Sequence, residues 1–194
     1  MKRRVAILTV LAAVLVAAYA ALHRPFPSDQ TPEGAYMRIA KSIMDEHPRE
    51  AFAYLETPAQ WACYTLRDTR KKALDRVRAS YPEPQRSELA AAYEPDALAP
   101  DGADVFVHEA KQRGWIARLR RDLSGIAKVD VAGDRASVVT ARGTRYAFRR
   151  RDNGIWGLTM FTADLEAEAE RAARDLSVVS AAADDFDRGN ARER

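Results

Sequence analysis

Apolar and polar residues alternate between Ile126 and Phe161, and this stretch carries the clearest structural pattern in the chain. Three turn pairs divide it, namely Gly133-Asp134, Arg142-Gly143 and Asn153-Gly154. Asn-Gly favours a tight hairpin turn because both central residues need positive φ. Trp156, Leu158 and Met160 share one face of the last run, since successive side chains of a strand point to opposite faces. The pattern predicts an antiparallel meander of three or four strands, with one apolar face that helices must cover.

Helical spacing of apolar residues comes before the meander. Thr31-Pro32-Glu33 predicts a helix start, because a hydroxyl caps the first turn and proline needs no hydrogen bond there. A short helix is predicted at 49–55, and a second Thr-Pro start at Thr57 predicts a helix to about residue 81. Residues 103–123 are predicted as one helix. Residues 81–101 hold four prolines and are predicted as a connecting loop with one helical turn, the alternative being a mobile flap.

A second periodic pattern follows the meander. Apolar residues recur at alternating spacings of four and three over three heptads, at Leu165, Ala169, Ala172, Leu176, Val179, Ala183 and Phe186. This predicts an amphipathic helix over residues 162–188 whose narrow stripe packs closely on another surface. We favour docking on the rest of the chain, and pairing with another copy is the alternative. Residues 189–194 are predicted to be a disordered tail.

The N-terminal residues 1–22 suggest a membrane-related segment. Lys2, Arg3 and Arg4 precede an uncharged run from Val5 to Leu22, which as a helix would be roughly 27 Å long. The run predicts either a transmembrane anchor with the body outside the cytoplasm, or a signal peptide cleaved near Ala20. Residues 23–30 are predicted to be a linker, and residues 31–161 an α+β domain.

The charged residues are balanced over most of the chain and unbalanced in one stretch. The net charge of +3 equals the contribution of the three N-terminal cations, because the other 28 basic residues match 28 acidic ones. Residues 111–151, however, hold twelve Lys or Arg and three Asp. This distribution favours internal charge complementarity or an acidic partner over nucleic acid.

Five arginines at the hairpin ends form a candidate surface for an anionic partner: Arg142, Arg145, Arg149, Arg150 and Arg151. The partner would be a lipid headgroup, a cell-wall polymer or an acidic protein. The alternative is a solubilising rim that forms salt bridges with the acidic C-terminal helix.

The Thr-Pro helix starts, the Trp-containing helix and the meander residues Gly133–Val139, Thr144–Phe148 and Gly154–Trp156 together resemble the nuclear-transport-factor-like superfamily over residues 31–161. The likeness is to membrane-anchored extracytoplasmic members found in bacteria. It implies a cone-shaped α+β fold in which a bent sheet wraps around a long helix, often with a ligand pocket at the mouth. Five aromatic residues are predicted to be core, with part of them a candidate pocket lining: Trp61, Tyr64, Trp115, Tyr146 and Trp156.

Asp104 and His108 are spaced to touch on a helix, and with Glu109 they are the nearest approach to an acid–base cluster. A surface pair is the alternative, and no catalytic residue is assigned. The single cysteine, Cys63, is predicted to be a buried apolar residue. Three separated histidines and one cysteine supply no zinc ligand set, so neither a metal nor a cofactor is predicted.

These observations predict a non-enzymatic binding or assembly module, anchored as a single-pass protein in the bacterial inner membrane with a periplasmic domain. Its partner would be an envelope protein, or a second copy bound through residues 162–188. The alternative is a small-molecule carrier, or an isomerase- or dehydratase-like enzyme, with a pocket over the sheet.

Overall fold

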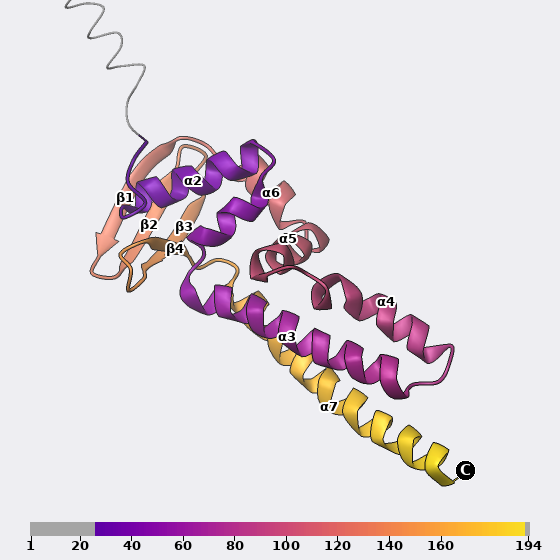
Figure 1. Cartoon of the computed structure of the whole chain (residues 1–194). Coiled ribbons are helices and arrows are strands. Elements are labelled where there is room, and N and C mark those ends of the chain that lie inside the picture. The colour runs from indigo at the N-terminus through magenta and orange to yellow at the C-terminus, as the bar shows by residue number, and fades with distance from the viewer. Residues whose placement is uncertain (1–25, 193–194) are drawn as a thin grey trace, which may run out of the picture.

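The computed structural model describes residues 26–192 and shows an α+β fold, as predicted (Figure 1). The helices are α2 (Pro32–Met44), the 3₁₀ helix η1 (Pro48–Tyr54), α3 (Thr57–Ser80), α4 (Gln85–Ala97), α5 (Gly102–Gln112), α6 (Trp115–Asp122) and α7 (Thr162–Arg192). The strands are β1 (Ile126–Ala132), β2 (Arg135–Thr140), β3 (Arg145–Arg150) and β4 (Trp156–Leu158).

The first helix starts where the sequence predicts. Thr31 Oγ1 accepts the Gly34 N–H at 3.1 Å, and Pro32 occupies the first turn. The second Thr-Pro start differs by one residue, because Glu56 is the N-cap of α3 and no side chain caps it. Residues 26–30, predicted to be part of a linker, lie against the fold, since the Asp29 carbonyl accepts the Trp156 N–H at 3.2 Å.

The meander is confirmed as one antiparallel sheet in the order β1-β2-β3-β4. The glycine of each predicted turn pair has positive φ. The inner face of the sheet is apolar and buried, with Val138, Tyr146, Phe148 and Leu158. Met160 lies beyond the end of β4 and is 40 % exposed, so it does not share this buried face as predicted.

The segment 81–101 contains a full helix, α4, where one helical turn was predicted. Pro84 is its N-cap, and the carboxylate of the preceding Glu83 accepts both the Ser87 N–H at 3.2 Å and the Ser87 hydroxyl at 2.7 Å. Pro95 falls in the last turn, so its missing N–H affects only the end of the helix. Tyr93 and Ala97 are buried against α3 in a second apolar cluster, and this packing favours the helix.

The helix predicted over 103–123 is broken into α5 and α6. Gly114 separates them in the left-handed conformation, with φ +67°, which a residue without Cβ adopts at little cost. The break redirects the chain, so that Trp115 of α6 stacks on Phe161 with ring centroids 4.5 Å apart.

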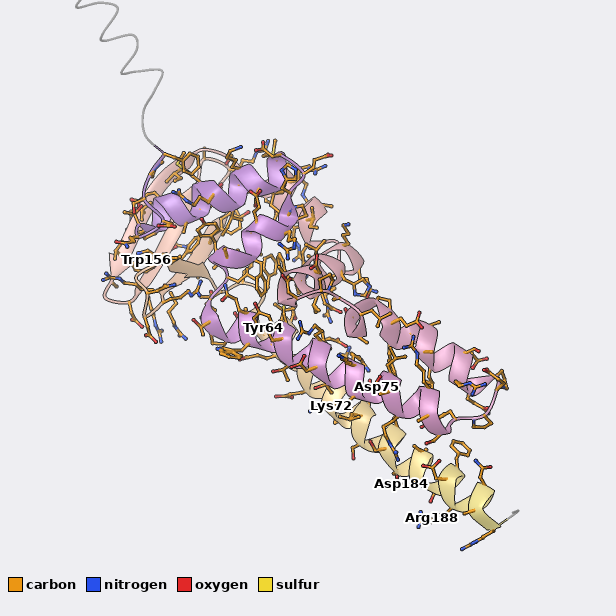
Figure 2. The ribbon with its side chains drawn as sticks, in the orientation of Figure 1. Tyr64, Lys72, Asp75, Trp156, Asp184 and Arg188 are labelled. Atoms are coloured by element: carbon orange, nitrogen blue, oxygen red, sulfur yellow. The ribbon has the colours of Figure 1, made fainter. Side chains whose placement is uncertain are left out.

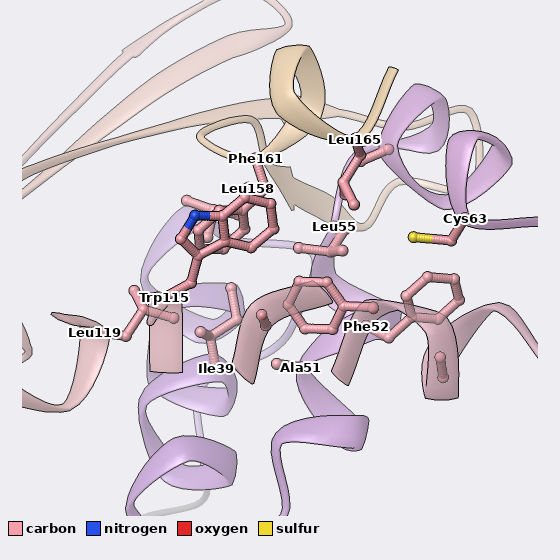
Figure 3. Close-up of a cluster of buried hydrophobic side chains, with 14 of the residues drawn as sticks. Ile39, Ala51, Phe52, Leu55, Cys63, Trp115, Leu119, Leu158, Phe161 and Leu165 are labelled. Carbon is pink, nitrogen blue, oxygen red and sulfur yellow. The ribbon is translucent and has the colours of Figure 1, made fainter. Parts of the chain in front are cut away.

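Two apolar clusters hold the molecule together. The larger one lies between the sheet, α2, η1, α5, α6 and the first turns of α3 and α7, and Figure 3 shows part of it around Phe52, Trp115 and Phe161. The smaller one joins the second halves of α3 and α7 to α4. These three helices form an arm that extends away from the sheet (Figure 1).

Helix α7 runs beside α3, and its apolar stripe faces the rest of the chain. Leu165, Ala169, Ala172, Val179 and Ala183 are all buried. The favoured docking of this stripe is therefore confirmed, and self-association through helix 162–188 would have to use its other faces. The helix reaches Arg192, so residues 189–192, predicted to be a disordered tail, are helical.

The predicted single-pass localisation in the inner membrane is contradicted. Across residues 26–192, every helix is either too short or too polar to cross a bilayer. The segment Val5–Leu22, on which that prediction rested, lies outside the residues that the structure describes.

Candidate functional site

Three of the five aromatic residues predicted for a pocket lining lie in the packed core. Trp115, Tyr146 and Trp156 are at most 4 % exposed. Trp115 stacks on Phe161, and the Tyr146 ring lies 5.5 Å from that of Tyr36. The Trp156 indole N–H donates to the Gln30 carbonyl at 3.1 Å. These rings fill the space over the sheet.

The other two aromatic residues lie on α3, away from the sheet. Trp61 is 66 % exposed and meets the Tyr64 ring edge-on, with centroids 6.2 Å apart. Figure 2 shows Tyr64 on α3 and Trp156 on β4, at separate places in the fold. A hollow of about 430 Å³ beside Trp61 is formed by α3 and α7. The five residues therefore do not line one cavity.

The five predicted arginines divide into two groups. Arg142 and Arg151 donate to backbone carbonyls of other elements. The first donates to the Arg121 carbonyl, and the second to the Ala53 carbonyl at 2.9 Å and to Gln60 Oε1 at 3.1 Å. Arg145, Arg149 and Arg150 of β3 are exposed. The predicted salt bridges to the C-terminal helix are absent from the described residues, and several acids of α7 pair instead with arginines of α3 and with Arg113.

Arg145 and Arg149 belong to a larger basic surface on the outer face of the sheet. Strand pairing places Arg135 directly opposite Arg149, and Lys128 opposite Val139, which in turn lies opposite Arg145. We define these four cations, Lys128, Arg135, Arg145 and Arg149, as the basic face. All four are exposed. Helix α2 packs on the other, apolar face of the sheet, so the basic face is open to solvent (Figure 1).

Two of these four residues were missed in the sequence. Arg135 and Lys128 lie 14 and 21 positions before Arg149 along the chain, and only the hairpin registers bring them together. The signal was the alternation in Arg135-Ala136-Ser137-Val138. It puts Arg135 and Ser137 opposite the buried Ala136 and Val138.

The charges of the basic face are only partly compensated. Lys128 pairs with Asp130 at 2.8 Å, and Arg149 Nη1 lies 3.6 Å from Glu56 Oε2. Arg145 donates to the Ser137 hydroxyl at 3.0 Å. Within residues 26–192, Arg135 has no acidic partner within salt-bridge distance. The face therefore presents a net positive potential to an approaching anion.

A second polar cluster lies where α4 meets α5. His108 Nδ1 is 2.6 Å from Asp96 Oδ1, so the predicted pair with Asp104 does not form. Asp104 instead accepts from Arg49 at 3.3 Å. Glu109 is 4 % exposed and accepts from Arg113 at 2.8 Å. The fold thus joins His108 to a carboxylate twelve positions earlier, which helical spacing could not reveal.

Ion pairs continue from this cluster through the helical arm. Arg113 also binds Glu168 of α7 at 2.7 Å. Arg70 of α3 lies 3.5 Å from Glu168 and 2.7 Å from Asp175, with its guanidinium over the Tyr93 ring. Buried charges need such partners. The chain of ion pairs fixes α3, α4, α5 and α7 relative to one another.

Cys63 lies in the core, as predicted, and is inert as a nucleophile. Burial, together with the nearby negative charges of Glu109 and Asp96, raises the pKa of Cys63 to about 12. The reactive form of cysteine is the thiolate, which such an environment suppresses at neutral pH.

Comparison of the chain with protein-family models, curated proteins and solved structures finds no match among any of them. The resemblance of residues 31–161 to the nuclear-transport-factor-like superfamily therefore stays a prediction.

Proposed function

We propose that this protein is a non-catalytic binding module that uses the basic face of its sheet to bind an acidic protein partner. The observation that carries the proposal is the placement of Lys128, Arg135, Arg145 and Arg149 on one uncovered sheet face, with Asp130 as the acid among them. The inner face is filled with aromatic side chains, which supports binding outside the fold over chemistry within it.

The pairing of Arg135 with Arg149 supports this function on energetic grounds. Like charges directly opposite one another on a sheet destabilise the strand pair. Glu56 offsets only the Arg149 charge, at 3.6 Å. A carboxylate from a partner would bridge the two guanidinium groups, and such charge-assisted hydrogen bonds are roughly twice as strong as neutral ones.

The residues between the cations favour a polypeptide over nucleic acid. Ser137, Val139 and Ala147 carry short side chains, so a partner backbone can approach the sheet closely. Single-stranded nucleic acid is held largely by bases that stack on aromatic rings. The aromatic residues of β2 and β3, Tyr146 and Phe148, point to the buried face and are 2 % exposed.

Binding of fluorescent poly-L-glutamate to the full chain tests this function. We expect saturable binding that weakens as salt rises, because exposed charges are screened over about 8 Å at physiological ionic strength. The double variant Arg135→Glu/Arg149→Glu should bind at least about tenfold more weakly. The matched control is Lys71→Glu/Lys72→Glu, which makes the same charge change on the exposed side of α3.

Comparison of the two double variants distinguishes binding at the basic face from attraction by the net charge of the protein. Equal losses in both would show that the basic face is not the binding surface. Tighter binding of a single-stranded oligonucleotide of equal charge than of poly-L-glutamate would contradict the choice of an acidic protein as partner. Far-UV circular dichroism of each variant checks that the fold is retained.

A further inference from the structure

Three metal-ligating side chains converge where the last turn of α4 meets α5. Asp96, His108 and Glu109 each offer one ligand atom, and these atoms all lie within 4.8 Å of one another. Asp96 and Glu109 are buried, at 7 % and 4 % exposed, while the His108 side chain is 28 % exposed. The cluster is therefore enclosed by protein on the carboxylate side and reachable from solvent along the imidazole.

We propose that Asp96, His108 and Glu109 form a binding site for a divalent transition-metal ion such as Zn²⁺. One imidazole nitrogen and two carboxylate oxygens make a mixed ligand set that suits Zn²⁺, Mn²⁺ and Fe²⁺ better than Ca²⁺, which takes six to eight oxygens. Water entering beside His108 would complete the coordination.

The charges around the site favour a bound cation. Glu109 pairs with Arg113, and Glu168 pairs with Arg113, Arg70 and Arg171, so these two acids have cationic partners. Asp96 is not joined to these ion pairs, and His108 is its one side-chain partner within residues 26–192. If the His108 imidazole is neutral, the buried Asp96 carboxylate has no positive charge to compensate it, and this raises the free energy of the folded state. A divalent ion between Asp96 and Glu109 would supply the missing positive charge.

Gln112 can hold the imidazole in the form that binds the ion. As the side chains lie, the Gln112 amide N–H donates to His108 Nε2 at 2.8 Å, which leaves the Nδ1–H to donate to Asp96 Oδ1 at 2.6 Å. A metal ion at Nδ1 would displace that proton. The Gln112 amide, rotated by half a turn, would then accept the Nε2–H. Gln112 is thus a positioning residue, the kind of partner whose loss lowers metal affinity about 10- to 100-fold.

Calorimetric titration of the full chain with Zn²⁺, and visible absorption with Co²⁺, tests the site. We expect one ion per chain and the d–d bands of coordinated Co²⁺. His108→Gln and Asp96→Asn should each weaken binding at least about tenfold, and Gln112→Leu about tenfold. His47→Gln is the matched control, because His47 is exposed and follows α2 outside the cluster.

The variants also separate ligand loss from unfolding. Zn²⁺ should raise the thermal midpoint of the wild type and of His47→Gln, and raise that of Asp96→Asn less at the same Zn²⁺ concentration. Gln112→Leu removes an exposed side chain and keeps all three ligands, so its weaker binding cannot come from loss of the fold. The absence of saturable Zn²⁺ binding by the wild type would overturn the site. So would full affinity in both His108→Gln and Asp96→Asn.

Discussion

At the scale of single residues, Gly157 marks a close backbone approach between β4 and the start of α3. A Cβ atom built on Gly157 would be 2.5 Å from the Glu56 Cα, so the two segments leave no room for a side chain. The Glu56 N–H donates to the Leu158 carbonyl at 3.2 Å, and this contact holds Glu56 beside the sheet edge. Gly157 thereby positions the carboxylate that faces Arg149 of the basic face.

Gly157→Ala should accordingly lower the free energy of unfolding by about 1–3 kcal/mol, because the added methyl group forces two backbones apart. Chemical denaturation measures the change. Gly125→Ala is the control, since a Cβ at Gly125 meets nothing within 4 Å, and it should shift stability by less than about 0.5 kcal/mol. Equal effects of the two substitutions would refute the close approach.

Cys63 predicts a pH dependence whose sign follows from its pKa. The unfolded thiol ionises near its ordinary pKa of about 8.5, while the folded thiol keeps its proton up to about 12. Between these values the unfolded state holds fewer protons, so stability falls as pH rises. Comparing the unfolding free energy of wild type and Cys63→Ala from pH 8 upward isolates this effect from that of the tyrosines. As pH rises, Cys63→Ala should lose less unfolding free energy than the wild type. If the two plots of unfolding free energy against pH ran parallel, they would contradict a buried, neutral thiol.

At the scale of elements, the patterns that could be predicted were those set by neighbours in the chain. The alternation in 126–161 gave the meander, and the stripe from Leu165 to Phe186 gave α7, because each depends only on spacing. Helix α4 could not be predicted in this way. Its stability depends on Tyr93 packing against residues of α3, which spacing within the segment does not reveal.

At Gly114 the sequence suggested a continuous helix where the structure has a break. Its neighbours continue a helical pattern on both sides, so residues 103–123 suggested one helix. Tertiary packing sets the break. The chain changes direction at Gly114, so that Trp115 stacks on Phe161, which follows β4 in the sequence. The candidate sites were missed for the same reason. The basic face depends on hairpin register, and the partner of His108 depends on how α4 docks beside α5.

The seam between α3 and α7 provides a stability test. Ala183 is fully buried there, while Ala181 on the same helix is exposed. Ala183→Leu should cost about 1–3 kcal/mol by overpacking the seam. Ala181→Leu makes the same chemical change on the open side and should be neutral within about 0.5 kcal/mol. Thermal or chemical unfolding of both variants tests the docking, which would be disproved if Ala181→Leu were the more damaging change.

At the scale of the whole molecule, the helical arm and the outer face of the sheet arrange their charges differently. In the helical arm, cations and anions are paired across helices, as with Arg70 and Asp175 at 2.7 Å or Arg78 and Glu94 at 2.8 Å. On the outer face of the sheet, cations meet cations, as with Arg135 and Arg149. Paired charges hold the arm together, whereas the charges on the open face are only partly compensated and are available to a partner. This contrast supports the proposal that the partner binds the sheet and not the arm.

Mapping where poly-L-glutamate binds on the full chain, by the change in each backbone amide NMR signal, tests the central claim most directly. The account predicts that the perturbed amides gather in β1, β2 and β3, around Lys128, Arg135, Arg145 and Arg149, and that those of α3 and α7 stay unchanged. Perturbations centred on the helical arm, or on the Trp61 surface of α3, would contradict it.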